Sequence, residues 1–313
     1  MSTKASQYQK KTPREHVLLR PDTYIGDIEK TTDNMYLCTG DLKDINIIKK
    51  KCTFVPGLLK LFDEILVNSR DAGSNDNTCN TIKVNIDNDE GCISIWNNGQ
   101  DGIPVEQHPE HKVLVPSMIF GELLTSSNYD DTEKRTTGGR NGYGAKLANI
   151  FSTEFVVEVG DSKNKKKFVQ HWYDNMSRSN KASVTKYASK ISYIKITFYP
   201  DFEKLHLKKE DIFNDNIESS VKTDHLNLFK RRCYDIAGTT SLGVNGKSSS
   251  STMKVYFNDN KLDVINFKKY IELYYKDETI YYDDSSNRWE VGVLYRPDNG
   301  FEVISFVNGI FTF

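Results

Sequence analysis

Several features that define other protein classes are missing from this sequence. It has no apolar run near the roughly 18 residues of a membrane-spanning helix, and no secretory signal pattern follows Met1. The five cysteines are odd in number and form no Cys-x-x-Cys pair, which argues against a disulfide framework and a zinc site. Acidic and basic residues nearly balance, 43 against 42, so no overall charge draws the chain to nucleic acid. We expect a soluble protein with reduced thiols and no membrane partner.

What the sequence does contain is a glycine-rich segment at residues 138–146. Glycine lets backbone N–H groups approach an anion closely, and the following residues, 145–151, have the composition of a helix start. Lys146 adds a positive charge beside this junction. The pattern is typical of a phosphate-binding loop, and a flexible surface loop ending at a helix cap is the alternative for this segment alone.

A second segment, residues 57–71, predicts an amphipathic helix. Its leucine, isoleucine and phenylalanine side chains gather on one face, and Glu64 and Asn68, four residues apart, project to the same side along the edge of that face. A carboxylate beside a neutral amide suits a general base next to an oxygen ligand for Mg²⁺. Taken alone, the same spacing also fits an ordinary solvated helix face.

A β-hairpin is predicted at residues 82–96. Apolar and polar residues alternate from Ile82 to Ile86, a turn follows at residues 88–91, and the second strand returns to Trp96. Asn97 stands at the end of this strand, just before the glycine turn that contains Gly99. An amide in this place can be held toward a heterocycle, although Asn-Gly is also common turn chemistry.

In this order and spacing, the three segments resemble the ATP-binding fold shared by type II topoisomerases, heat-shock ATPase chaperones, MutL and sensor histidine kinases. Residues 15–26, 62–68, 123–131, 234–238 and 304–308 are in addition similar to eukaryotic-type DNA topoisomerase II. The resemblance extends from about residue 8 to residue 308 and rests on the collinearity of these motifs. The fold that it implies is α+β: a GHKL (Bergerat) ATP-binding α/β sandwich followed by a partial transducer domain of the ribosomal protein S5 domain 2-like type.

The resemblance also implies roles for individual residues. Glu64 would be the general base that deprotonates the attacking water, Asn68 the magnesium ligand, and Asn97 the residue that recognises adenine. Tyr8 would lie in an N-terminal strap that reaches the nucleotide of a partner subunit. The remaining implied contacts, to the ribose and the phosphates, are Ser126, Ser127, Asn128, Gly139, Arg140, Asn141, Gly142, Tyr143, Gly144, Ala145 and Lys146. The expected cofactors are ATP and Mg²⁺.

The implied organisation is a strap at residues 1–11, an ATPase domain at residues 12–240 and the truncated beginning of a transducer at residues 241–313. An amphipathic helix ending near residue 238 and a Gly- and Ser-rich stretch at residues 239–252 mark the junction. Before it, strands are predicted at residues 155–159, 168–173 and 193–198. After it, strands are predicted at residues 253–257, 289–295 and 302–307, with a helix near residues 266–275.

The function that this resemblance implies is the ATP-binding and ATP-hydrolysing gate of a type IIA DNA topoisomerase, EC 5.6.2.2. Such an enzyme works as a homodimer on double-stranded DNA, which it grips mainly through a cleavage core that this chain is expected to lack. The location would be nuclear for a cellular eukaryote, and cytoplasmic or virion-associated for a large DNA virus. The alternatives are a GHKL ATPase module of a chaperone or DNA-repair clamp, and an inactive fragment.

Three departures from the family pattern stand out. Ser69 to Ala72 replace the usual Ala-Ala-Asp-Asn, with Asp71 kept. One more residue than usual separates Gly99 from Gly102, which bears on the geometry beside Asn97. The chain ends before the Gln-Thr-Lys loop whose lysine reaches the γ-phosphate in the family.

Overall fold

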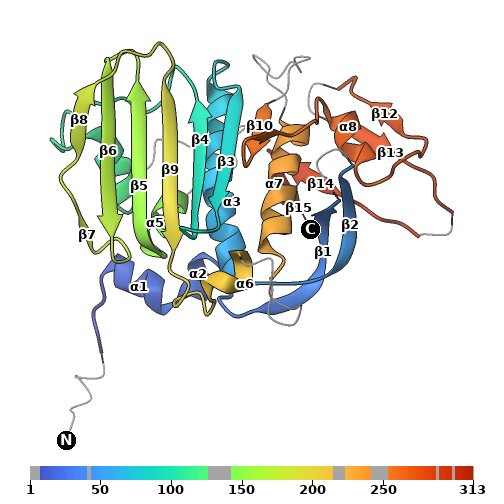
Figure 1. The fold of residues 1–313 in the computed structure, drawn as a ribbon, viewed down its shortest axis with the longest axis horizontal. Coiled ribbons are helices and arrows are strands. Elements are labelled where there is room, and N and C mark those ends of the chain that lie inside the picture. The colour runs from blue at the N-terminus through green and yellow to red at the C-terminus, as the bar shows by residue number, and fades with distance from the viewer. Residues whose placement is uncertain are drawn as a thin grey trace, which may run out of the picture.

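A nine-stranded sheet forms the centre of the computed structural model, which describes residues 8–40, 44–125, 142–213, 223–240, 253–286, 289–297 and 300–312 (Figure 1). The only parallel pair in this sheet joins β10 to β3, and all other neighbours run antiparallel. The strands follow the order β11 (Asn260–Lys261), β10 (Lys254–Phe257), β3 (Thr81–Asp87), β4 (Cys92–Asn98), β9 (Tyr193–Pro200), β5 (Ser152–Asp161), β6 (Lys166–Tyr173) and β7 (Arg178–Ser179), with β8 (Ser183–Lys186) also on β6.

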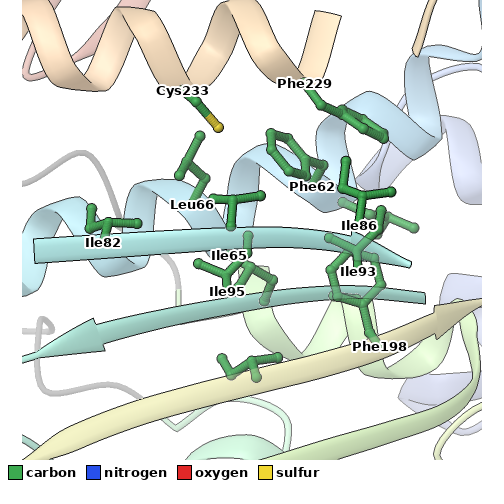
Figure 2. Packing of buried hydrophobic residues seen from close by; sticks show 14 of the residues in the cluster. Phe62, Ile65, Leu66, Ile82, Ile86, Ile93, Ile95, Phe198, Phe229 and Cys233 are labelled. Carbon is green, nitrogen blue, oxygen red and sulfur yellow. The ribbon is translucent and has the colours of Figure 1, made fainter. Parts of the chain in front are cut away.

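Helix α3 (Pro56–Asn75) runs along one face of this sheet and α7 (His225–Thr239) packs against α3. Pro56 occupies the first turn of α3, where its missing N–H costs nothing. The side chains of Leu61, Phe62 and Ile65 are fully buried, and each such burial contributes about 1.5–3 kcal/mol. Figure 2 shows the side chains of α3 between α7 and strands β3 and β4, and the rings of Phe62 and Phe229 stack with centroids 4.2 Å apart.

The other described elements surround this core. A hairpin of β1 (Thr31–Thr39) and β2 (Asn46–Phe54) packs against α7 on the side of the molecule away from β6 (Figure 1). After β11, the described chain forms helix α8 (Phe267–Glu272), the pair β12 (Tyr281–Asp283) with β13 (Val291–Val293), and the pair β14 (Ser305–Val307) with β15 (Ile310–Thr312). The remaining described helices are α1 (Pro13–Leu19), α2 (Pro21–Tyr24), α4 (Val115–Gly121), α5 (Gly144–Ile150) and α6 (Lys209–Phe213).

Most of the predicted elements are confirmed. The helix predicted at residues 57–71 spans Pro56–Asn75, and the predicted hairpin is β3 with β4. The strands at residues 155–159, 168–173, 193–198 and 253–257 and the helix near residues 266–275 are also present. The strands predicted at residues 289–295 and 302–307 are too long, since only Val291–Val293 and Ser305–Val307 pair, and each has a three-residue partner.

The division of the chain at residue 240 stays a prediction. Strand β10 lies beyond that boundary, yet it extends the central sheet by pairing in parallel with β3. Within the described part of the chain, no helix combines the length and apolar character needed to cross a membrane.

Candidate functional site

Glu64 and Asn68 lie one turn apart on α3, and neither belongs to the buried apolar face of this helix. The Glu64 side chain keeps 22% of its surface exposed, and its Oε1 lies 2.5 Å from Nζ of Lys60. Asn68 is exposed. The predicted pair is thus presented to solvent from a helix that the core holds rigidly, so both groups can meet a ligand.

Helix α5 begins directly beside Glu64. A Cβ atom built on Gly144 would come within 2.0 Å of Oε2 of Glu64, so a larger residue at this position would have to displace the Glu64 carboxylate. Contacts between α3 and α5 bring the end of the predicted phosphate loop to the predicted general base. The structure therefore brings together Glu64 and Gly144, which lie far apart in the sequence.

Lys146 does not reach solvent from this loop. Its side chain is 3% exposed, and its ammonium group donates hydrogen bonds to the carbonyl oxygens of Thr125, at 2.6 Å, and Gly142, at 2.5 Å. Burial lowers the pKa of Lys146 to about 8, so the group stays mostly charged at neutral pH. Thr125 directly precedes residues 126–141 and Gly142 directly follows them. Lys146 therefore links the two residues between which that segment is attached.

The other predicted contacts of this segment divide into two groups. Tyr143 is half-buried beside Tyr24, with ring centroids 6.3 Å apart, and Ala145 is buried in α5. Six predicted site residues lie outside the described residues: Ser126, Ser127, Asn128, Gly139, Arg140 and Asn141.

Asn97 is the second-last residue of β4, just before the glycine-containing loop that begins at Gly99. It pairs with Ile82 on β3 and Ile194 on β9, and only 5% of its surface is exposed. Its side-chain amide donates to the carbonyl oxygen of Asn98 at 3.1 Å and to Sγ of Cys79 at 3.6 Å. These two bonds fix the orientation of the amide, and its role toward a heterocycle stays a prediction.

One residue that the sequence analysis missed is Asp76, which follows the last turn of α3. Its carboxylate accepts hydrogen bonds from the backbone N–H and the hydroxyl of Thr78, at 2.8 and 2.5 Å, and from the backbone N–H of Asp101, at 2.8 Å. Burial raises the pKa of Asp76, but these hydrogen bonds outweigh it and leave the pKa below its usual range. The Asp-x-Thr spacing of an Asx turn was the available signal.

Tyr8 precedes α1 in the chain. It is 88% exposed and lies outside any helix or strand. This placement is compatible with an arm that contacts another molecule.

The donors present suit a magnesium ion that the protein holds by few ligands. Among the described residues, no three His, Cys, Asp or Glu side chains gather into a metal cage. Mg²⁺ is commonly bound by one or two protein oxygens together with substrate phosphates. The exposed amide of Asn68, one turn from Glu64 on α3, fits that mode.

Comparisons with known proteins agree with this geometry. The family model "Histidine kinase-, DNA gyrase B-, and HSP90-like ATPase" matches residues 55–178, which include Glu64, Asn97 and Lys146. DNA topoisomerase 2 of Acanthamoeba polyphaga mimivirus is 47% identical over 314 residues, covering 98% of this chain and 23% of the relative. DNA topoisomerase 2-alpha of Homo sapiens is 45% identical over 313 residues, covering 97% of this chain and 19% of the relative.

The crystal structure of the ATPase region of Saccharomyces cerevisiae topoisomerase II superposes with a TM-score of 0.86 at 44% identity. The match covers 99% of this chain and 76% of that chain. The chain belongs to the DNA topoisomerase II family. It corresponds to the ATPase region of a type IIA topoisomerase, so the predicted α+β GHKL fold with a transducer region is confirmed, and the chaperone and repair-clamp alternatives are set aside. The chain spans about a fifth of the length of the curated topoisomerases that it matches, which come from eukaryotes and a virus.

Proposed function

We propose that this topoisomerase ATPase region binds ATP with Mg²⁺, hydrolyses it, and acts as the ATP-operated gate of a homodimeric enzyme that passes double-stranded DNA. The observation that carries the proposal is the approach of Gly144 to Glu64. It places the end of a glycine-rich loop against a solvent-accessible carboxylate, one helical turn from the exposed amide of Asn68.

In this proposal Glu64 orients the attacking water and accepts its proton on a carboxylate oxygen. Lys60 helps to orient that carboxylate, because its ammonium group lies 2.5 Å from Oε1. Asn68 would hold Mg²⁺, which supplies positive charge to the phosphates when it is bound. The backbone N–H groups that precede α5 would meet the negative charge that builds up in the transition state.

Other residues would fix the nucleotide around this centre. Asn97, held by Asn98 and Cys79, would recognise adenine. Lys146 would exchange its bonds to the carbonyl groups of Thr125 and Gly142 for a phosphate oxygen. The proposed contacts to ribose and phosphate from the segment outside the described residues are Ser126, Ser127, Asn128, Gly139, Arg140 and Asn141, with Gly142, Tyr143, Gly144 and Ala145 completing the loop.

Dimer formation is proposed to depend on nucleotide and on the arm that contains Tyr8. We expect sedimentation velocity to show the wild-type chain shifting from monomer toward dimer when a non-hydrolysable ATP analogue and Mg²⁺ are added. Tyr8→Ala should weaken this shift, because the exposed ring is removed from the contact with the partner's site. If the sedimentation coefficient of the wild-type chain does not change when the nucleotide is added, the proposed nucleotide-dependent dimer is contradicted.

The magnesium role of Asn68 is tested by Asn68→Ala. Loss of a neutral oxygen ligand should raise the Kd for ATP in the presence of Mg²⁺ by about 10-fold, while the Kd in EDTA changes little. Isothermal titration calorimetry with and without Mg²⁺ measures both values. Asn34→Ala, which removes an exposed asparagine from β1, serves as the control and should leave both values unchanged. An Asn68→Ala chain with the wild-type Mg²⁺ dependence would show that Asn68 is only a solvated helix residue.

A further inference from the structure

The loop from Gly99 to Gly102 follows Asn97 and contains the extra residue that sets this chain apart from the family pattern. An insertion here could displace the strand end that carries Asn97. Instead, both residues between the two glycines, Gln100 and Asp101, have their backbone N–H groups bound to side chains that directly follow α3. The loop is therefore tied to the helix that also carries Glu64 and Asn68.

On its inner side the loop is held by Asp76 and Thr78. Oδ2 of Asp76 accepts from the N–H of Asp101 at 2.8 Å, and Oδ1 accepts from the hydroxyl of Thr78 at 2.5 Å. The same hydroxyl accepts from the N–H of Gln100 at 2.7 Å. Asp76 is 6% exposed, so water competes poorly for these charge-assisted hydrogen bonds.

On its outer side the loop is bound by two further hydrogen bonds and borders a cavity. The Gln100 side chain donates to the carbonyl oxygen of Lys190 at 2.7 Å and accepts from the hydroxyl of Ser162 at 2.8 Å. A cavity of about 220 Å³ lies between the loop and the turn that joins β5 to β6. Asp101 and Lys163 form an ion pair there, but both side chains are more than half exposed, so the pair contributes little. The position of the loop thus depends chiefly on its hydrogen bonds, of which those to Asp76 are the most buried.

We propose that Asp76 is a positioning residue that sets the base-binding end of the nucleotide pocket relative to its phosphate end. Asp76 is the residue that caps the C-terminal end of α3, about three turns beyond Glu64. By fixing loop 99–102 to the end of that helix, it holds Asn97 at a constant distance from Glu64 and Asn68. This role rests on the proposed function, in which Asn97 recognises adenine.

The test is Asp76→Asn, measured by nucleotide titration and steady-state hydrolysis. Asparagine keeps one acceptor oxygen but turns the other into a donor, so the bond from the N–H of Asp101 or from Thr78 is lost. We expect the Kd for both ATP and ADP to rise about 10-fold, the loss typical of one hydrogen bond to a charged group. The preference for ATP over GTP should fall, while kcat at saturating ATP stays within about 2-fold, because the phosphate end is not altered.

Asp87→Asn is the matched control. Asp87 also accepts two backbone hydrogen bonds, from Asp89 and Glu90, but in the turn at the opposite end of the β3–β4 hairpin from Asn97. Its substitution should change neither affinity nor base preference. Thr78→Val is a second variant at an exposed position, and it should reproduce part of the affinity loss even if Asp76→Asn folds poorly.

The outcomes separate the two proposals. If the wild-type chain binds no ATP, the proposed function fails and the role of Asp76 fails with it. If the wild-type chain binds ATP and both Asp76→Asn and Thr78→Val bind it equally well, only the role of Asp76 is overturned. A fall of kcat in proportion to affinity, together with a lower Tm, would also overturn it and make Asp76 merely a structural residue.

Discussion

Glu64→Gln is expected to lower the rate of ATP hydrolysis by about 10²-fold or more while ATP binding survives. Glutamine keeps the size of the side chain and its hydrogen-bonding reach, but it cannot accept a proton from water. The Glu64 carboxylate faces Gly144 on one oxygen and Lys60 on the other, so the substitution changes charge without adding bulk beside the loop. Turnover measured by phosphate release, together with Kd measured by calorimetry, separates the two effects.

Glu154→Gln provides the control for this result. Glu154 is a partly exposed glutamate on β5 that pairs with His171 and belongs to neither α3 nor α5. Its substitution should leave hydrolysis at the wild-type level. Wild-type turnover by the Glu64→Gln chain would show that another group deprotonates the water and would remove Glu64 from the mechanism.

The parts of this site that were predictable from the sequence are those whose signal is local. The buried face of α3 repeats at helical spacing, and the apolar positions of β3 and β4 alternate, so the helix and the hairpin follow from residues that are close together in the chain. Glu64, Asn68 and Asn97 are placed by these elements. Their positions on α3 and at the end of β4 were therefore correct, whereas the chemistry assigned to them stays a prediction.

The hydrogen bonds that fix the loop after Asn97 could not be predicted from a local pattern in this way. Asp76 meets Asp101 across 25 residues, and Gln100 meets Lys190 across 90 residues. In the sequence, Asp76 and Thr78 show only the composition of a turn after a helix. The β3–β4 hairpin brings this turn and the loop to the same end of the sheet, but its pattern does not specify which side chain binds which N–H. The contact of Gln100 with Lys190 depends in addition on how β4 and β9 pair, and no local pattern specifies that pairing.

Helix α7 illustrates the same limit for charged residues. The apolar face predicted for this helix comprises Leu226, Phe229, Cys233 and Ile236, of which Leu226 is half-buried and the other three are buried. Its basic and acidic residues would normally face solvent, yet Arg231, Arg232 and Asp235 are buried as well, because α3, α8 and β1 surround the helix. Their burial depends on which elements assemble around α7, and each buried charge must find a partner there.

Arg232 joins three parts of the chain through one guanidinium group. Its Nε donates to Oδ1 of Asp63 on α3 at 2.7 Å, and another nitrogen donates to Oδ2 of Asp235 on α7 at 2.6 Å. A third contact, at 3.4 Å, reaches the carbonyl oxygen of Gly309 between β14 and β15. Asp63 precedes Glu64 directly, so this buried network anchors the part of α3 that carries the proposed general base.

Arg232→Met should lower the free energy of unfolding by about 3 kcal/mol or more. Methionine preserves most of the apolar volume, but Asp63 loses its positive partner, and Asp235, whose side chain is 0% exposed, is left with the longer ion pair to Arg231 at 3.3 Å. Removing one member of a buried ion-pair network is costly. Urea denaturation measures the loss. Arg178→Met is the matched control, because its partner Asp174 and Arg178 itself are both more than half exposed, and breaking that pair should cost about 1 kcal/mol or less. Equal losses in the two variants would show that the Arg232 network is not what holds α7 and the β14–β15 hairpin to α3.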